Sequence, residues 1–483
     1  MLQNVHFDIG VRVLNIFFCI FVKIMCLVHL SHVKVERTKK LNEMNTIEHL
    51  YEVYKQHPVI TTDNRQCEKG AMFFALKGAT FDGNRFASSA LDAGCAYAVV
   101  DEAEYAPKCD ERYILVDDVL KTLQSLAAYH RQKHGIPVLQ ITGTNGKTTT
   151  KELVSAVLSK RYEVLFTQGN LNNHIGVPRT LLRIRPEHEI AVIETGANHP
   201  GEIEFLCRMV QADYGLITNV GCAHLEGFGS FDGVKRTKGE LYDDLANRGK
   251  AIFLNCDDEN LCQMARERGG DPLAKESKLQ VNPYVEAQVE DSSSFLKIQW
   301  RANEDAPWHT VQTHLVGAYN LANIRAAVTV GLFFGVPVED IDDALSTYVP
   351  TNSRSEFRDT GRNRLIVDAY NANPTSMNAA LDNFVSVKAA RKMVILGMMG
   401  ELGAVSETEH RNIVERLQKM ELEQVWLVGE EFQKLAEELP VSYRTFKHVD
   451  AVKEDIQSCP VTDYTILIKG SNSTKLYQLP ELL

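Results

Sequence analysis

The segment from Leu139 to Val154, LQITGTNGKTTTKELV, has the residue types of a phosphate-binding loop. An apolar, strand-like run leads into a glycine-rich turn with a lysine, and a helix-like run follows. Backbone N–H groups at such a turn, together with the positive end of a helix, attract phosphate. Lys147 could reach the terminal phosphates, and the Thr148 hydroxyl could bind magnesium. The predicted nucleotide-binding residues of the loop are Gly143, Thr144, Asn145, Gly146, Lys147, Thr148 and Thr149.

The spacing of this loop differs from that of the standard phosphate-binding loop, in which four residues separate the two glycines. Here Thr144 and Asn145 alone separate Gly143 from Gly146. The alternative interpretation is a plain strand-to-helix turn with a solvent-exposed lysine.

A carboxylate follows the next strongly apolar run. Glu194 ends the stretch EIAVIE, which reads as a buried strand. Open α/β sheets bind ligands at the carboxyl ends of their strands, and a carboxylate suits the hard magnesium cation. Alternatively, Glu194 caps the following helix or is a hydrogen-bonded acid.

Bulk composition describes an ordinary globular protein. A length of 483 residues predicts two to four domains, and 44% hydrophobic with 24% charged residues is typical of such proteins. The net charge of -11 argues against a general nucleic-acid binder. Ten cysteines without a C-x-x-C pair indicate reduced thiols in a cytoplasmic protein.

The first 43 residues differ in character from the rest. The apolar run Val11–Leu30 is interrupted by Arg12 and Lys23, and no small-residue cleavage site follows it. We therefore expect residues 1–43 to be an extension outside the fold, with the working protein beginning at Met44, and we expect no membrane contact.

The elements that must position these residues form three successive α/β parts. Strand-like and helix-like runs alternate throughout, as in α/β folds. Apolar strands followed by amphipathic helices from about Tyr129 onward predict a doubly wound parallel sheet. Between Pro272 and Thr313 the pattern is polar and hairpin-like, and the last part has four strand-like runs. The predicted domains are 44–126, 127–349 and 350–483.

The string GTNGKTTTKE resembles the ATP loop of the Mur ligase family, whose own loop has this shortened spacing. Further motifs follow in the order of that family over nearly all of residues 44–483, among them ILGMMGELG, His410 and ILIKGS. The resemblance implies a uridine-nucleotide-binding first domain, a central ATPase domain and a Rossmann-like C-terminal ligase domain. It also implies closure of the C-terminal domain over the nucleotide.

The resemblance implies two magnesium ions beside the ATP phosphates. Their ligands would be Thr148, Glu194, His224 and Lys238. In the family the matching lysine is carbamylated by CO2, which turns a cation into a carboxylate-like ligand. Taken alone, His224 would be a packing or solvent-facing residue and Lys238 an exposed helical lysine, and Lys235 is the less favoured match.

Nucleotide contacts are implied in two further segments. In GAYNLANIRAA, Asn320 and Asn323 match asparagines that approach the adenine. Arg354 matches an arginine that meets phosphate or ribose, and Asp368 and Asn371 match further nucleotide contacts. The chain departs from the family at three positions, where Ser353 replaces a glycine, Met398 an acid and Asn472 an arginine.

Substrate contacts are implied at both ends of the chain. Asn170 and Asn173 match asparagines that line the ligand cleft, although such residues also cap turns. Asn373 and Ser376 lie in YNANPTSM, a string that resembles the member of the family adding D-alanyl-D-alanine. In the first domain the candidates for the uridine nucleotide are Asn64, Arg65, Ala75, Leu76, Lys77 and Gly78. Arg65 could instead form a surface ion pair.

The expected reaction is therefore the ATP-dependent joining of D-alanyl-D-alanine to UDP-N-acetylmuramoyl-tripeptide through an acyl phosphate, by a cytoplasmic monomer. One alternative is the related ligase that adds a single third amino acid, but its D-N-P-[RK] string is absent. Folylpolyglutamate synthase is disfavoured by the uridine-type first segment. From another class, a non-catalytic ATP-binding scaffold would not need Glu194, His224 and Lys238 together.

Overall fold

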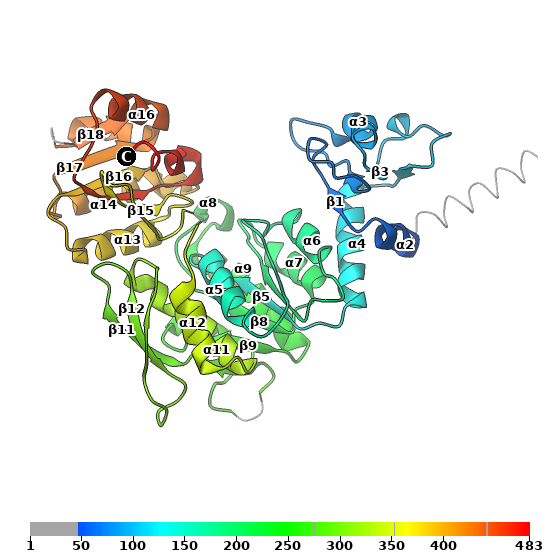
Figure 1. Cartoon of the computed structure of the whole chain (residues 1–483), viewed down its shortest axis with the longest axis horizontal. Helices are drawn as coiled ribbons and strands as arrows, with labels where there is room; N and C mark the ends of the chain where they lie inside the picture. The colour runs from blue at the N-terminus through cyan, green and yellow to red at the C-terminus, as the bar shows by residue number, and fades with distance from the viewer. Residues whose placement is uncertain (1–46, 275–276, 352, 441–442) are drawn as a thin grey trace, which may run out of the picture. The chain divides into compact units, whose positions relative to one another are not determined.

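The computed structural model describes residues 47–483 apart from 275–276, 352 and 441–442 (Figure 1). The prediction about residues 1–43 lies outside the described residues. The chain divides into two compact units, Met1–His130 and Arg131–Leu483. None of the described helices is long and apolar enough to cross a membrane.

The first unit contains a four-stranded parallel sheet in the order β1-β2-β3-β4. Its strands are β1 (Ile60–Thr61), β2 (Met72–Phe74), β3 (Tyr97–Val100) and β4 (Tyr113–Leu115). Its helices are α2 (Ile47–Gln56), η1 (Gly83–Phe86), α3 (Ala87–Asp92), η2 (Ala103–Tyr105) and α4 (Val119–Lys133).

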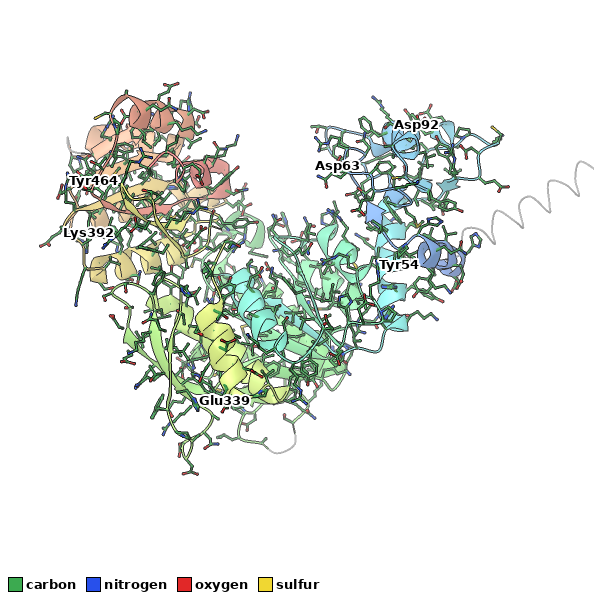
Figure 2. The ribbon with its side chains drawn as sticks, viewed as in Figure 1. Tyr54, Asp63, Asp92, Glu339, Lys392 and Tyr464 are labelled. Carbon is green, nitrogen blue, oxygen red and sulfur yellow. The ribbon has the colours of Figure 1, made fainter. Side chains whose placement is uncertain are left out.

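Buried apolar side chains of β2, α3 and β3 form a core in this unit. All three residues of β2 are buried, as expected for an inner parallel strand. Tyr54 lies on α2, where Figure 2 labels it. Its ring packs edge-on against that of His130 on α4, with ring centroids 5.1 Å apart. This contact joins α4 to α2, the first helix in the part of the chain that the structure describes.

The second unit begins with a six-stranded, fully parallel sheet in the order β10-β9-β8-β5-β7-β6. Its strands are β5 (Val138–Thr142), β6 (Val164–Phe166), β7 (Ile190–Glu194), β8 (Tyr214–Ile217), β9 (Ala251–Leu254) and β10 (Gln280–Pro283). Its helices are α5 (Lys147–Leu158), α6 (Gly176–Leu181), α7 (Glu202–Val210), α8 (Leu225–Phe228), α9 (Phe231–Asn247) and α10 (Glu259–Arg266).

Strand β5 lies at the centre of this sheet, between β7 and β8. Every residue of β5 and β7 is buried, because helices cover both faces of the sheet. The strand order reverses beside β5, and such switch points are where open α/β sheets bind ligands. The doubly wound sheet expected from the sequence is confirmed.

A small antiparallel sheet in the order β11-β12-β13 follows, as the hairpin-like pattern predicted. Its elements and the two helices after it are β11 (Glu286–Asp291), β12 (Lys297–Arg301), β13 (His309–Gln312), η3 (Ala318–Asn320), α11 (Leu321–Phe333) and α12 (Val338–Thr347). Trp300 is fully buried and donates its ring N–H to Asp342 on α12 at 2.7 Å. The sheet is thereby fixed to the helical layer.

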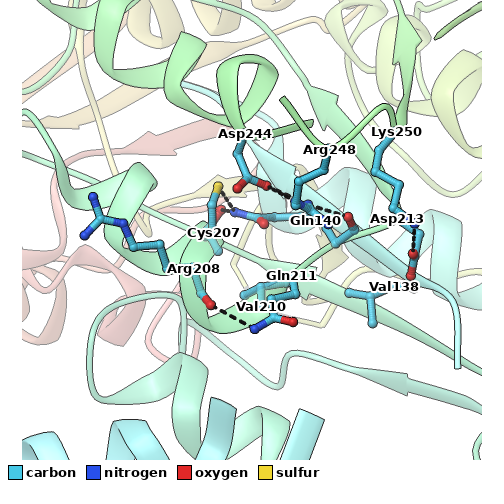
Figure 3. Close-up of polar contacts among 12 residues, drawn as sticks. Val138, Gln140, Cys207, Arg208, Val210, Gln211, Asp213, Asp244, Arg248 and Lys250 are labelled. Carbon is cyan, nitrogen blue, oxygen red and sulfur yellow. Dashed lines mark hydrogen bonds and ion pairs between the residues drawn. The ribbon is translucent and has the colours of Figure 1, made fainter. Parts of the chain in front are cut away.

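A polar network closes the edge of the central sheet at which the strands begin (Figure 3). The Arg131 guanidinium donates to the carbonyl of Val210 at 3.1 Å, and Arg248 donates to that of Ala212 at 2.6 Å. Arg248 also pairs with Asp244, and Lys250 pairs with Asp213 at 2.8 Å. Cationic side chains thus satisfy carbonyl groups at the end of α7, as helix C-termini require.

The last part contains a six-stranded sheet in the order β14-β15-β19-β16-β17-β18, parallel except at β14. Its strands are β14 (Glu356–Asp359), β15 (Arg364–Asp368), β16 (Lys392–Gly397), β17 (Gln424–Val428), β18 (Tyr443–Phe446) and β19 (Thr465–Lys469). Its helices are α13 (Pro374–Ser386), η4 (Gly403–Val405), α14 (Ser406–Leu417), α15 (Glu430–Lys434), η5 (Ala436–Glu438), α16 (Val449–Ser458), η6 (Asn472–Thr474) and η7 (Leu476–Gln478).

The four strands expected here are present, and β14 and β18 are two more at the edges. Edge strands need less apolar sequence than inner strands, so EFRD and YRTF carried no clear signal.

Candidate active site

The predicted phosphate loop connects the end of β5 to α5, which begins at Lys147. Gly143 and Gly146 have φ angles of 141° and 80°, which favour glycine. A Cβ at Gly143 would lie 2.0 Å from the Thr218 hydroxyl, and one at Gly146 would lie 2.5 Å from the side-chain oxygen of Asn323. Both glycines are therefore required by conformation and by space, and the expected strand–turn–helix order is confirmed.

Thr218 and Asn219, which directly follow β8, fix the loop backbone. The Thr218 hydroxyl and the Asn219 amide donate to the carbonyl of Asn145 at 2.6 and 3.0 Å. The Asn219 side-chain oxygen accepts the N–H of Asn145 at 3.0 Å. Neither residue was expected from the sequence, although both lie at the carboxyl end of a strand, where ligand sites gather.

Lys147 lies across the loop and is half-buried. Its Nζ donates to the carbonyls of Gly143 and Thr144 at 2.8 and 2.9 Å. Burial lowers the pKa of Lys147 to about 8, while the charge of Glu194 acts against this and that of Arg354 adds to it. A phosphate bound at the loop would favour the charged amine.

Asn320 and Asn323 hold α11 against α5. The Thr150 hydroxyl donates to Asn323 at 3.0 Å, and the Asn323 amide donates to Asn320 at 2.8 Å. The Asn320 amide in turn donates to the carbonyl of Val316 at 2.9 Å. Asn323 thus contacts α5 beside the phosphate loop and Asn320 holds Asn323 in place, whereas contact of either asparagine with adenine stays a prediction.

Thr148 and Glu194 each carry a buried oxygen with no hydrogen-bond partner among the described residues. The side chains are 2% and 1% exposed, and the atoms are Thr148 Oγ1 and Glu194 Oε2. Leaving a buried polar atom unpaired costs about 1–3 kcal/mol, so such atoms need an explanation. Hydroxyl and carboxylate oxygens are ligands for magnesium, and the two residues therefore fit a metal site. Glu194 is not a helix cap, because Gly201 precedes α7.

The other oxygen of Glu194 is held by Asn172. The Asn172 amide donates to Glu194 Oε1 at 2.8 Å, and the Glu194 N–H donates to the Thr167 hydroxyl at 3.0 Å. The carbonyl of Thr167 accepts a hydrogen bond from the buried Lys151 at 2.5 Å. These contacts orient the carboxylate and leave Oε2 as the atom available to a ligand.

The asparagines on either side of Asn172, Asn170 and Asn173, are both exposed. The Asn173 side chain accepts the N–H groups of Ile175 and Gly176 at 3.1 and 2.9 Å, which is the turn-capping role considered for this cluster. Substrate contacts of Asn170 and Asn173 stay predictions. Asn172 was not named from the sequence, where nothing distinguishes it from its neighbours.

Lys238 on α9 is 2% exposed, so the interpretation as an exposed helical lysine is wrong. Its Nζ lies 3.3 Å from the carbonyl of Ala197 and 5.3 Å from the centre of the Phe228 ring. Burial lowers the pKa of Lys238 to about 7, and the charge of Lys147 adds to this. Much of the amine is therefore neutral near neutral pH. Lys235, the other candidate, pairs with Asp232 at 3.5 Å.

His224 directly precedes α8 and has a φ of 53°. Its Nδ1 contacts the carboxylate of Glu401, and its ring packs edge-on against Phe228 with centroids 6.2 Å apart. Burial lowers the pKa of His224, and the charge of Glu401 acts against this. The packing role is present, and the role as a magnesium ligand stays a prediction.

Within the described part of the chain, no group of three or more His, Cys, Asp and Glu side chains could hold a metal ion. The predicted ligand set has only Glu194 and His224 of these types. Its other members are the Thr148 hydroxyl and Lys238, which would need modification to bind a cation.

The N-terminus of α13 meets the phosphate loop. Asn373 caps α13, since its side chain accepts the N–H of Ser376 at 2.9 Å and the Ser376 hydroxyl accepts the N–H of Asn373 at 3.1 Å. The Asn373 amide also donates to the Asn145 side chain at 2.8 Å. The segment after β15 therefore lies directly on the loop that would hold phosphate.

Asp368, at the end of β15, forms an ion pair with Lys469, which is 1% exposed. Lys469 also donates to the carbonyl of Asn371 at 3.3 Å. The Asn371 side chain accepts the N–H of Ala372 at 2.9 Å. Contacts of Asp368 and Asn371 with a nucleotide stay predictions.

Three family models match successive parts of the chain. They are described as Mur ligase family, catalytic domain (residues 58–131), Mur ligase middle domain (residues 141–331) and Mur ligase, glutamate ligase domain (residues 353–472). The UDP-N-acetylmuramoyl-tripeptide–D-alanyl-D-alanine ligase of Bacillus subtilis is 35% identical over 431 residues, which cover 87% of this chain and 92% of that protein. The chain belongs to the Mur ligase family.

Solved structures of Mur ligases share this fold. MurF from Acinetobacter baumannii superposes with a TM-score of 0.77 at 30% identity, covering 90% of this chain and 97% of that one. MurF from Thermotoga maritima, solved in complex with ADP, has a TM-score of 0.75 at 23% identity and covers 88% and 97%. The three-domain α/β fold and the ligase class expected from the sequence are confirmed. The domain boundaries stay predictions.

The first departure from the family pattern, Ser353, has a φ of 55°. This is a conformation that glycine adopts without cost, which accounts for the glycine of the family at this position. The Ser353 N–H donates to Glu356 at 3.1 Å, and its carbonyl accepts the N–H of Ala369 at 3.0 Å. The guanidinium carbon of Arg354, the next residue, lies 3.8 Å from the centre of the Tyr370 ring. The strained serine is thus held from both sides, and Arg354 has a fixed platform.

The other two departures lie near one another at the end of β16. A Cβ at Gly429 would lie 2.9 Å from Met398, so the thioether packs closely on this glycine. The backbone of Met398 accepts a hydrogen bond from the Ser471 hydroxyl at 2.8 Å, and Asn472 follows at the start of η6. Met398 and Asn472 therefore place an apolar side chain and a neutral amide at the two positions where the resemblance implied an acid and an arginine.

In the first unit, Arg65 is exposed and pairs with Asp63 at 2.8 Å, which is the surface ion pair considered as its alternative role. The Asn64 amide lies 3.4 Å from the Ser89 hydroxyl. Lys77 pairs with Asp101 and Glu102 at 3.0 and 2.7 Å.

The backbone candidates of the first unit are Ala75, Leu76 and Gly78. Ala75 and Leu76 are buried, and Gly78 donates its N–H to the carbonyl of Phe81 at 2.9 Å. The contacts of all these candidates of the first unit with a uridine nucleotide stay predictions.

Proposed function

We propose that this Mur ligase joins D-alanyl-D-alanine to UDP-N-acetylmuramoyl-tripeptide, with ATP as the energy source and ADP and phosphate as products. Relatives named for this activity support the assignment, at 35% identity in Bacillus subtilis and 32% in Escherichia coli. The observation that carries the chemistry is the pair of buried, unpartnered oxygens of Thr148 and Glu194 beside the phosphate loop.

In the proposed reaction the terminal phosphoryl group of ATP moves to the terminal carboxylate of the tripeptide. The amine of D-alanyl-D-alanine then attacks the acyl phosphate, and the tetrahedral intermediate collapses to the new peptide bond and phosphate. The loop Gly143–Thr149 holds the ATP phosphates, and Lys147 and Arg354 offset their charge. The protein contributes mainly by positioning and electrostatic stabilisation.

Magnesium fits the proposed site because of the unpaired oxygens, and it would offset phosphate charge and help align the reacting groups. Thr148, Glu194 and His224 would hold two ions together with a carbamate on Lys238. A buried lysine with a depressed pKa supports this modification, since only the neutral amine reacts with CO2. The carbamate would also replace repulsion between Lys238 and Lys147 by attraction.

The remaining substrate contacts are part of the same proposal. Asn320, Asn323, Asp368 and Asn371 would contact ATP. Asn170 and Asn173 would line the ligand cleft near the sugar-nucleotide, and Asn373 and Ser376 would also contact substrate. Asn64, Arg65 and the segment Ala75–Gly78 would serve the uridine nucleotide. The eight described cysteines are free thiols, which supports a cytoplasmic location, and we propose a monomer.

Phosphate release with ATP, magnesium and the UDP-tripeptide tests the proposal. D-alanyl-D-alanine should stimulate release, whereas single amino acids should not. Stimulation by a single L-amino acid but not by the dipeptide would instead assign the third-residue ligase.

Replacement of Lys238 tests the carbamate. Lys238→Ala should lose nearly all activity, and short carboxylates such as formate should restore part of it by occupying the vacated volume. Lys235→Ala is the matched control on the same helix and should retain activity. Equal losses in the two variants, or no rescue in the first, would contradict the carbamate.

A further inference from the structure

The contact between His224 and Glu401 joins residues 177 positions apart in the chain. His224 follows β8 of the central sheet, and Glu401 follows β16 of the C-terminal sheet. Both are non-glycine residues with positive φ, 53° and 60°. Such backbone conformations are uncommon and gather at functional sites. Two strained residues therefore meet at a candidate metal ligand.

The segment that carries Glu401 is fixed on both sides. Before it, the N–H of Met399 donates to the buried ring of His410 at 2.9 Å. After it, Leu402 is 3% exposed, and a Cβ at Gly403 would lie 3.4 Å from the side chain of Glu226 on α8. Packing thus fixes the backbone of this segment, whereas the Glu401 side chain itself is exposed and is held by its contact with His224.

The contact between His224 and Glu401 determines which ring nitrogen of His224 carries the hydrogen. A carboxylate has no proton to donate, so Nδ1 of His224 carries the hydrogen of this contact. In a neutral ring Nε2 then keeps its lone pair. Histidines that bind metal ions commonly donate their other N–H to a carboxylate, which fixes the tautomer and the ring orientation.

We propose that Glu401 is a positioning residue that holds His224 as the Nδ1–H tautomer and so leaves Nε2 as its metal-binding nitrogen. The inference rests on the proposed function, in which His224 is a magnesium ligand. The C-terminal domain then completes the metal site from outside the central sheet, and metal affinity depends on its docking.

Metal titrations of Glu401 variants test this role. Glu401→Ala should need about tenfold or more magnesium for half-maximal ligase activity, with a much smaller loss of rate at saturating magnesium. Glu401→Asp should recover part of the affinity. Glu421→Gln, an exposed carboxylate of the same domain, is the matched control and should behave as wild type.

A binding readout separates this proposal from the proposed function. Electron paramagnetic resonance of free Mn²⁺, recorded with ADP present, gives the Mn²⁺ affinity of each variant. Glu401→Ala should bind Mn²⁺ at least about tenfold more weakly than Glu421→Gln. This measurement does not use the ligase reaction, so it stands even if the UDP-tripeptide is not the substrate.

A double-mutant cycle shows whether Glu401 acts through His224. In a His224→Ala background, Glu401→Ala should cause no further loss of Mn²⁺ affinity. A full loss there would mean that Glu401 acts independently of His224 and would overturn the proposal. So would wild-type metal affinity in the single variant Glu401→Ala.

Discussion

At the scale of single residues, three neighbouring asparagines have three different environments. Asn172 orients Glu194, Asn173 caps a turn and Asn170 is exposed. The orientation of Glu194 matters because its second oxygen is buried without a partner. Asn172 is therefore the member of the cluster on which the proposed metal site depends.

Asn172→Ala should reduce ligase activity about tenfold or more and raise the magnesium requirement, because the carboxylate of Glu194 loses the donor that fixes it. The measurement is initial rate against magnesium concentration. Gln168→Ala, exposed in the same segment, is the control and should match wild type. Identical magnesium curves for the two variants would rule out the positioning role.

His410 gives the stability of the C-terminal domain a pH dependence. Its Nε2 accepts the N–H of Met399 at 2.9 Å, and its Nδ1 donates to the carbonyl of Ser406 at 2.7 Å. Burial lowers the pKa of His410, so the folded protein holds the neutral ring. Unfolded histidine titrates near pH 6.5, and the unfolded chain therefore binds the proton first as the pH falls.

The contribution of His410 to the free energy of unfolding should consequently be constant above about pH 6.5. Below that pH it should decrease by at most about 1.4 kcal/mol per pH unit. Urea unfolding across this range would measure the slope. His410→Gln, which cannot be protonated, should be less stable near neutral pH but lose less on acidification. Parallel curves for the two proteins would show that His410 does not contribute.

At the scale of elements, the junction of β5 and α5 depends on close packing by α11. Asn323 fills the space beside Gly146 that any side chain would need, 2.5 Å from an added Cβ. The same asparagine binds Thr150, so the loop and two helices are fitted together.

Gly146→Ala should therefore lower the free energy of unfolding by more than backbone strain alone would lower it. Gly249→Ala is the control, since Gly249 has a φ of 63° with nothing within 4 Å of an added Cβ. The control should lose about 1 kcal/mol and keep its activity, whereas Gly146→Ala should lose more stability and most ATP-dependent activity. Urea unfolding and phosphate release measure the two effects. Equal stability losses would argue against the clash with Asn323.

At the scale of the whole molecule, the C-terminal domain touches the phosphate loop through Asn373 and Asn145. Asn373 also caps α13. Its side-chain amide therefore stabilises that helix and joins the loop after β15 to the phosphate loop after β5. A substitution that keeps the cap and changes the charge separates these roles.

Asn373→Asp should leave α13 capped, since aspartate is an equally good cap, and so retain the thermal stability of the protein. The new negative charge beside the loop should raise the ATP concentration for half-maximal rate about tenfold by repelling phosphate. The matched control is Asn378→Asp on the same helix, where Arg416 contacts the side chain at 2.7 Å. If both variants bind ATP as wild type does, Asn373 does not lie at the nucleotide site.

Much of this protein follows from sequence alone. Continuous apolar runs determined the inner strands of each sheet, because strands buried on both faces tolerate little else. The order and spacing of GTNGKTTTKE and YNANPTSM indicated the family that the comparisons confirmed. The glycines of the loop could be assigned to backbone conformation because no other residue adopts it without cost.

Tertiary structure alone decided which side chains meet. The burial of Lys238, the choice of Asn172 over its neighbours and the contact of His224 with Glu401 all depend on where loops from different strands come together. Hydrophobic periodicity reports which face of an element is buried, whereas loop side chains far apart in sequence carry no such signal. The sequence therefore determined the elements and the chemistry of the loop, and the packing of those elements determined the partners of each functional group.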